Sequence, residues 1–221
     1  MPDQNKNFNR PLVDDEMINI IKNYEGDVPY MYRDAKGNVT AGLGLHLRRE
    51  EDALRYPFKA MISEKEFGRL ATQMEKRDAY KKVQEQPYGQ GYISKRYNPF
   101  ENKDLLAIGL DPAASREETR RILLQEEGLL KSKMRDFDAI PHPARQALLD
   151  MQYNIGDKKF RREYQDDNNK TVKAWPKLFD ALEAKDYKRA SEEVRSSDVG
   201  DDRNGWRKNK MLEAERLKNT Q

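Results

Sequence analysis

The sequence predicts an α+β fold that is mainly α, with a small β-hairpin lobe near the N-terminus and a larger helical lobe. Apolar residues recur at three- and four-residue spacing through most of the chain, which is typical of amphipathic helices. Two strand-forming runs flank a turn within residues 28–47. Charges of both signs nearly balance and aromatic residues are widely spread, which favours a folded chain.

Composition sets limits on function. The chain has 221 residues, enough for one large domain or two smaller lobes around a real core. Its 42 basic and 39 acidic residues leave a net charge of +3, too small to indicate a nucleic-acid-binding protein. The absence of cysteine excludes disulfides, thiolate catalysis and zinc–thiolate sites. No segment resembles a signal peptide or a membrane span, so we expect neither an export signal nor membrane insertion.

The first ten residues are polar and are expected to form a flexible lead-in. A first helix is then expected to begin at Asp14 or Asp15, whose side chain can accept hydrogen bonds from the free backbone N–H groups of the first turn. Gly26 suits the left-handed conformation that ends a helix. The buried face of this helix is expected to contain Met17, Ile20, Ile21 and Tyr24. Beyond it, "VPYMYRD" predicts a strand, "AKG" a turn and "NVTAGLGL" a returning strand.

Capping boxes at Ser63–Glu66 and Ser115–Glu118 predict two later helices. Pro143 and Pro176 indicate the starts of two more, because proline is favoured in a first helical turn, and Gly156 indicates the end of one. A polar loop over residues 196–205 is expected to precede a last basic helix from about residue 206.

Three residues of the hairpin region have a pattern that suits acid–base chemistry. Glu25 lies at the C-terminal end of the first helix, where the negative end of the macrodipole disfavours an ionised carboxyl group. A protonated carboxyl group is what a general acid needs. Asp34 opens the hairpin turn near backbone N–H groups, and we expect it to be an ionised carboxylate. The two form a candidate acid–base pair.

Thr40 completes this arrangement. A three-residue turn places Asp34 opposite Asn38 and Tyr32 opposite Thr40, so these residues share one face of the hairpin. A water molecule held by the Asp34 carboxylate and the Thr40 hydroxyl would complete an inverting glycosidase site, in which two carboxyl groups stand roughly 6.5–9.5 Å apart. Taken alone, the three residues fit a charged surface hairpin beside a helix-terminal glutamate, which is the default interpretation.

The residues around them favour the first interpretation. The motif E-G, then Y-x-D, then G-x-x-T-x-G-x-G with a histidine just beyond resembles the signature of the phage-type lysozymes, glycoside hydrolase family 24. The resemblance continues in "ARQALLDMQYNIG", "WPKLFDALEAKDYKRASEEV" and "NGWRKNKMLEAERL". It covers about 14–47 and most of 115–218, and its first block is the specific one.

The resemblance implies one lysozyme-like, two-lobed domain over 1–221. The catalytic helix end and hairpin would occupy 14–47, a family-atypical insert 48–112 and the helical lobe 113–221. It implies hydrolysis of the β-1,4 bond between N-acetylmuramic acid and N-acetylglucosamine in peptidoglycan, with no metal or other cofactor. The implied catalytic residues are Glu25 as acid, Asp34 as base and Thr40 as the residue that holds water. A lytic transglycosylase and a non-catalytic wall-binding module are the alternatives.

The implied substrate contacts are Tyr153, from its place in "DMQYNIG", and His46. The family usually places histidine directly after the second glycine, whereas Leu45 intervenes here. The shift reverses the facing of the strand, so His46 is expected to face the cleft instead of pairing with a carboxylate at Glu126. The cation that the family places near the catalytic glutamate has no direct counterpart, because Asn209 stands there and Arg207 only nearby.

A Gly-, Pro- and Tyr-rich stretch in the 48–112 segment suits contact with polysaccharide or single-stranded nucleic acid, or packing on its own aromatic rings. Its candidate residues are Tyr88, Tyr92, Lys95, Arg96, Tyr97 and Phe100. The expected partner is the glycan strand of peptidoglycan, with no nucleic acid, and the expected state is a monomer. We expect the protein to act on the cell wall in the periplasm of a target or host bacterium, delivered by phage lysis machinery or a secretion system.

Overall fold

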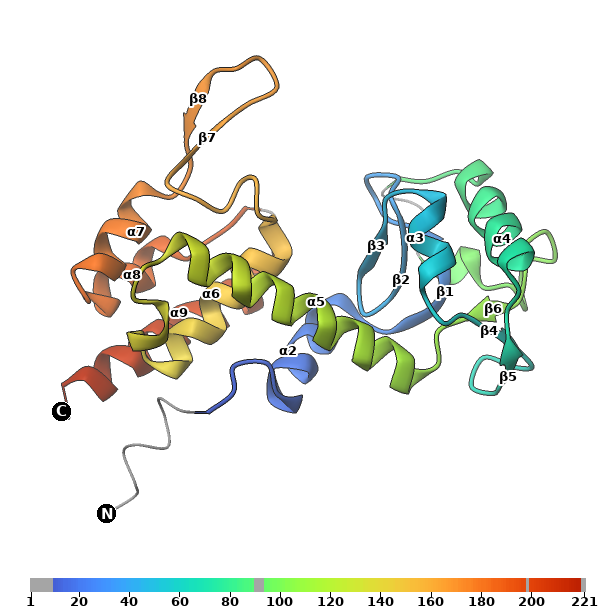
Figure 1. The fold of residues 1–221 in the computed structure, drawn as a ribbon, viewed down its shortest axis with the longest axis horizontal. Coiled ribbons are helices and arrows are strands. Elements are labelled where there is room, and N and C mark those ends of the chain that lie inside the picture. Colours follow the sequence, from blue (N-terminus) through green and yellow to red (C-terminus); the bar gives the residue numbers. More distant parts are fainter. Residues whose placement is uncertain (1–9, 90–93, 198, 220–221) are drawn as a thin grey trace. The chain divides into compact units, whose positions relative to one another are not determined.

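The computed structural model describes residues 10–89, 94–197 and 199–219, and these form an α+β fold that is mainly helical, as predicted. The chain divides into two compact units (Figure 1). One contains residues 18–121, and the other contains 122–221 together with the residues up to Met17. The expected lead-in over residues 1–9 and the candidate Tyr92 lie outside the described residues.

The unit 18–121 is built around an antiparallel six-stranded sheet in the order β3-β2-β1-β6-β4-β5. Its strands are β1 (Val28–Arg33), β2 (Val39–Gly42), β3 (Leu45–Leu47), β4 (Lys59–Met61), β5 (Phe67–Leu70) and β6 (Ile108–Gly109). The 48–112 segment therefore supplies half of the strands, and β6 pairs directly with β1. Along the chain, α3 (Glu50–Arg55) lies between β3 and β4, and α4 (Gln73–Glu85) and the short helix η1 (Ser94–Tyr97) lie between β5 and β6. Helix α4 packs on β1, β2 and β6.

Helix α2 (Asp15–Glu25) begins and ends where the sequence predicts. The Met17 N–H donates to Oδ1 of Asp14 at 2.9 Å, which caps the first turn. Gly26 has a φ of +77°, and its N–H donates to the carbonyl of Lys22 at 2.9 Å. Met17 and Ile21 are buried as predicted, together with Ile18, whereas Ile20 and Tyr24 are only half-buried.

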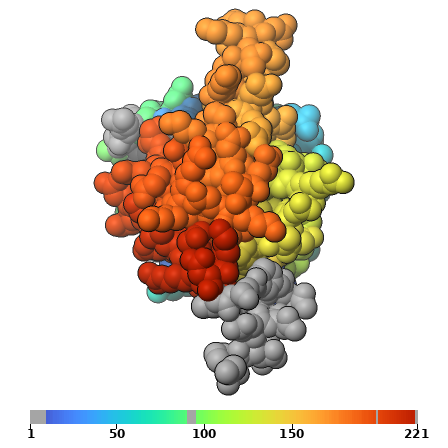
Figure 2. Space-filling view, turned by 90° about the vertical axis from the view of Figure 1, so that its left-hand side faces the viewer, coloured from blue at the N-terminus to red at the C-terminus, as the bar shows by residue number. Residues whose placement is uncertain are grey.

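The other unit is helical. After the second half of α5 (Pro112–Lys133) come η2 (Phe137–Ala139), α6 (His142–Ile155), α7 (Pro176–Glu183), α8 (Tyr187–Glu193) and α9 (Asp201–Lys218). Helix α6 packs on α9, α9 on α8, and α8 on α7. The hairpin of β7 (Glu163–Gln165) and β8 (Thr171–Lys173) projects from this unit (Figure 2). Within the described part of the chain, no helix is long and apolar enough to span a membrane.

Several predicted elements differ from the structure, and strands β4 to β8 form outside the predicted hairpin. Ser63–Glu66 forms the turn between β4 and β5 and not a helix start, because residues 67–70 pair with 59–61 across the sheet. The helix predicted at Ser115 exists but begins at Pro112, since Asp111 accepts the Ala114 N–H at 2.7 Å. The last helix begins at Asp201, five residues earlier than expected.

A buried ion cluster joins α6 to α9. Asp150 on α6 is fully buried, and its two carboxylate oxygens accept from two arginines on α9. Nη2 of Arg203 lies 2.8 Å from Oδ1, and Nε of Arg207 lies 2.6 Å from Oδ2. Arg207, considered from sequence for its closeness to the position of the family's cation, is therefore committed to Asp150 in the helical unit.

The substitution Asp150→Asn is expected to lower the free energy of unfolding by about 3–5 kcal/mol, because it leaves two buried guanidinium groups without their counter-charge. Asp167→Asn is the matched control, since Asp167 is 92% exposed in its ion pair with Lys158 and such pairs contribute roughly 0–1 kcal/mol. Urea unfolding monitored by circular dichroism measures both. Equal effects of the two substitutions would contradict a structural role for the cluster.

Candidate active site

Three neighbouring strands bring three side chains into one row. Tyr32 on β1 lies opposite Thr40 on β2, and Thr40 lies opposite His46 on β3. Residues that stand directly opposite each other in an antiparallel pair project to the same face of the sheet. The predicted pairing of Tyr32 with Thr40 is therefore confirmed, and His46 extends the row by one strand.

Thr40 is buried, with 2% of its surface exposed. Among the described residues its hydroxyl oxygen has no hydrogen-bond partner. Buried polar groups are nearly always paired, because leaving one unpaired costs roughly 1–3 kcal/mol. The Thr40 hydroxyl therefore has hydrogen-bonding capacity that no described residue uses, and its role in holding a water molecule stays a prediction from the sequence.

Asp34 is oriented by the turn that it opens. Its Oδ1 accepts from the N–H groups of Lys36 at 2.9 Å and Asn38 at 2.8 Å, and its Oδ2 accepts from the Asn38 side-chain amide at 2.8 Å. The Asp34 N–H donates to the Asn38 carbonyl at 2.9 Å, so these two residues face each other as expected. Three donors fix the carboxylate, while 24% of the side chain stays exposed.

The His46 side chain, on β3, lies close to the Asp34 side chain, which follows β1. Its Nε2 lies 4.0 Å from Oδ2 of Asp34, and 54% of its side chain is exposed. The preceding Leu45 is 1% exposed and lies in the core, as the alternation along a strand requires. Leu45, the residue by which this chain departs from the family pattern, therefore packs in the core. His46 projects to the opposite face of the strand, toward Asp34. A protonated His46 can form an ion pair with that carboxylate.

Glu25 ends α2 and packs against the turn between β2 and β3. A Cβ placed on Gly44 would lie 3.3 Å from Cβ and from Cγ of Glu25, so glycine permits this close approach. Gly42 and Gly44 both have positive φ, of +58° and +80°. The sequence predicts one returning strand through Leu45; the structure has two, because these glycines turn the chain after Gly42.

Tyr32 connects the two carboxyl groups electrostatically. Burial raises the pKa of the Tyr32 phenol to about 12, with further contributions from the negative charges of Glu25 and Asp34. The Tyr32 phenol thus responds to the charges of both carboxyl groups. Tyr32 was not singled out from sequence as a site residue, although the motif Y-x-D contains it.

Two further residues considered from sequence belong to the helical unit. Tyr153 is half-buried on α6. Glu126 on α5 accepts a hydrogen bond from the side-chain amide of Gln152 at 2.7 Å. The structure therefore brings Glu25, Asp34, Thr40 and His46 together in one unit, whereas the predicted contact through Tyr153 comes from the other.

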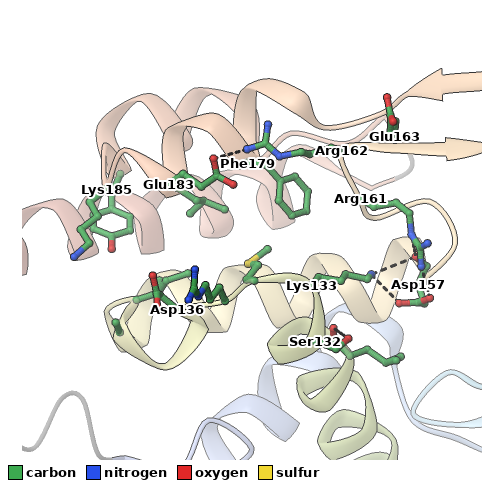
Figure 3. A pocket seen from close by; sticks show the side chains of 17 residues that line it. Ser132, Lys133, Asp136, Asp157, Arg161, Arg162, Glu163, Phe179, Glu183 and Lys185 are labelled. Carbon is green, nitrogen blue, oxygen red and sulfur yellow. Dashed lines mark hydrogen bonds and ion pairs between the residues drawn. The ribbon is translucent and has the colours of Figure 1, made fainter.

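The helical unit also contains a cavity of about 750 Å³ that the sequence does not predict (Figure 3). Its walls come from α5, η2, α7 and the segments that follow α6 and α7. Its charged side chains largely neutralise each other, since Arg162 pairs with Glu183 and Lys133 with Asp157, both at distances below 3 Å. None of the predicted site residues lines it.

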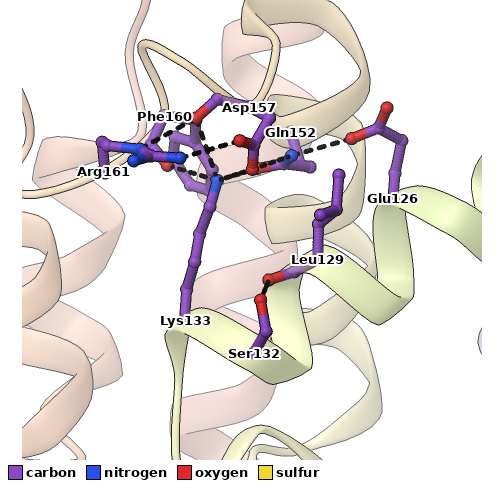
Figure 4. A network of polar contacts seen from close by, with 8 residues as sticks. All are labelled: Glu126, Leu129, Ser132, Lys133, Gln152, Asp157, Phe160 and Arg161. Atoms are coloured by element: carbon purple, nitrogen blue, oxygen red, sulfur yellow. Dashed lines mark hydrogen bonds and ion pairs between the residues drawn. The ribbon is translucent and has the colours of Figure 1, made fainter. Parts of the chain in front are cut away.

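Lys133 is the centre of a polar network on the wall of this cavity (Figure 4). Its Nζ donates to the side-chain oxygen of Gln152 at 2.8 Å and to the carbonyl of Phe160 at 2.9 Å, and it lies 2.8 Å from Oδ1 of Asp157. Burial lowers the pKa of Lys133, and the Asp157 carboxylate opposes that shift. The network attaches the segment after α6 to α5, which is a structural role.

No group of three or more histidine, aspartate or glutamate residues within the described ranges is arranged to hold a metal ion. No protein-family model matches the chain, and no curated protein matches it. The function therefore has to be inferred from the residues of the candidate site.

In a tyrosine titration followed by ¹³C NMR, Tyr32 is expected to ionise near pH 12. Because its pKa is higher in the folded state than the ordinary value of about 10, the contribution of Tyr32 to the free energy of unfolding is present below pH 10 and is lost as the pH rises from 10 to 12. The substitutions Glu25→Gln and Asp34→Asn each lower this pKa, because each removes a nearby negative charge. The pKa of Tyr187, which burial and Glu215 raise to about 12, stays unchanged as the internal control. A pKa of Tyr32 that does not respond to either substitution contradicts this site geometry.

Proposed function

We propose that the protein is a peptidoglycan hydrolase of the phage-lysozyme type. It cleaves the β-1,4 bond between N-acetylmuramic acid and N-acetylglucosamine with inversion of configuration. The observation that carries the proposal is the buried and unpartnered hydroxyl of Thr40 in one row with Tyr32 and His46. The same unit holds the oriented Asp34 carboxylate and the Glu25 side chain beside Gly44.

In the proposed reaction, Glu25 gives its proton to the glycosidic oxygen as the bond from that oxygen to the anomeric carbon breaks. Asp34 takes a proton from a water molecule as the water oxygen forms a bond to the same carbon from the opposite face. Thr40 holds that water through its hydroxyl. The fixed orientation of Asp34 supports its role as base, because positioning a catalytic group accounts for a large part of rate enhancement.

The proposal places Tyr153 of α6 against a sugar ring, since a tyrosine offers an apolar face and a polar hydroxyl. His46 contacts the substrate beside Asp34. The protein is proposed to act as a monomer on the cell wall of a target or host bacterium, delivered by phage lysis machinery or a secretion system.

A lytic transglycosylase also uses a catalytic glutamate, but it admits no attacking water and forms a 1,6-anhydro product. The unpartnered Thr40 hydroxyl beside Asp34 favours the hydrolase, because a transglycosylase has no water to hold there. A wall-binding module without activity would bind peptidoglycan and release nothing. Mass spectrometry of released muropeptides, run beside a peptidoglycan sedimentation assay, separates the three.

The substitution Glu25→Gln is expected to lower the rate of muropeptide release by 10²–10⁴-fold with the fold intact, because the amide cannot donate a proton in place of the acid. Glu16→Gln, at an exposed position in the first turn of the same helix, is the control and is expected to retain full activity. Retained release by the Glu25 variant would remove Glu25 from the mechanism.

The substitution Thr40→Val is expected to lower the rate of muropeptide release by about 10²-fold while leaving the free energy of unfolding unchanged or higher. The hydroxyl has no partner among the described residues, so its removal costs no protein hydrogen bond, and a buried unpaired group is lost. Thr40→Ser keeps the hydroxyl and is expected to retain most activity. A loss of stability with retained release would show that the hydroxyl is structural.

A further inference from the structure

We propose that Tyr88, on the 48–112 segment, is a stacking platform for a pyranose ring of the glycan strand beside the Asp34 turn. The ring lies against the turn itself, since a Cβ on Gly37 would stand 2.8 Å from Cε2 and 2.9 Å from Cζ of Tyr88. Glycine at position 37, with a φ of +86°, permits this approach. The inference deepens the proposed function, because it names a further contact with the same substrate.

The ring rests on a fixed support. The Arg33 guanidinium lies 3.9 Å from the centroid of the Tyr88 ring. Its Nε donates to the Gly37 carbonyl at 3.0 Å, and its Nη1 donates to the carbonyls of Gln84 and Gln86 at 2.9 and 3.0 Å. Three carbonyl acceptors hold the plane of the guanidinium, so the tyrosine stacked on it is oriented before any ligand arrives.

The backbone before Tyr88 is held as well. The hydroxyl of Tyr97 donates to the carbonyl of Pro87 at 2.6 Å, and Tyr97 is buried. The Tyr97 ring stands 6.5 Å from the ring of Tyr32, which is opposite Thr40 in the row of the candidate site. The segment that carries Tyr88 is therefore attached to the candidate site at two places, the Asp34 turn and the Tyr32 ring.

Tyr88 is nevertheless 49% exposed, although it is a large aromatic residue with one face on Arg33. A half-exposed aromatic ring on a rigid support is suited to the apolar C–H face of a sugar. A nucleic acid fits less well. Arg33 has its charge engaged by the ring and three carbonyls, and the neighbouring Asp34 carboxylate repels phosphate.

The test measures binding of peptide-free glycan strands, prepared from purified peptidoglycan, by isothermal titration calorimetry. The Glu25→Gln protein serves as the parent so that the strands stay intact. Adding Tyr88→Ala is expected to raise Kd about tenfold, and Tyr88→Phe is expected to restore the parental Kd because stacking needs only the ring. Met74→Ala, which removes an exposed apolar side chain from α4 of the same segment, is the control and leaves Kd unchanged.

In the active protein, Tyr88→Ala is expected to raise KM about tenfold with kcat unchanged, because the platform binds ground and transition states alike. An unchanged Kd in the Tyr88→Ala variant, or no glycan binding by the parent, overturns the platform. It is also overturned if a single-stranded oligonucleotide, but not the glycan, depends on Tyr88 for binding. Tyr88-dependent glycan binding by a wild-type protein that cleaves nothing would reject the proposed hydrolysis and retain the platform.

Discussion

The register between β1 and β2 is the constraint on which the candidate site depends. The turn after Asp34 sets it, because two backbone N–H groups donate to Oδ1 of Asp34 and close the turn at one length. Side chains along a strand alternate between faces, so a slip of one residue would move Thr40 to the other side of the sheet. The Asp34 carboxylate thus closes the turn, and the turn in turn fixes the position of that carboxylate. The resulting strand register aligns Tyr32, Thr40 and His46 in one row.

The 48–112 segment supports this turn from outside the hairpin. Strand β6 extends the sheet at β1, and α4 packs on β1 and β2. Arg33 then joins the carbonyl of Gly37 in the turn to the carbonyls of Gln84 and Gln86 at the end of α4. A segment that is atypical in length for the family that the sequence resembles is thus part of the same sheet and holds the turn that carries Asp34.

Local signals explain which features the sequence predicts well. Asp14 and Gly26 mark α2 because a cap and a left-handed glycine act within one helical turn. The face of the sheet from which Thr40 projects follows from the length of the turn alone. Ser63–Glu66 misleads, since a serine with a glutamate three residues later also suits a turn, and long-range pairing of β5 decides between the two. The pairing of β6 with β1 and the burial of Asp150 between two arginines join distant segments, so no local pattern reveals them.

The central claim is that a water molecule held by Thr40 and activated by Asp34 attacks the anomeric carbon from the face opposite the leaving oxygen. The most direct test is ¹H NMR of the reducing end in the first minutes of digestion of peptidoglycan glycan strands, before the anomers equilibrate. The account predicts that the α-anomer of the new reducing sugar forms first, from the β-linked substrate. A β-anomer, or a 1,6-anhydro sugar with no reducing end, would contradict it.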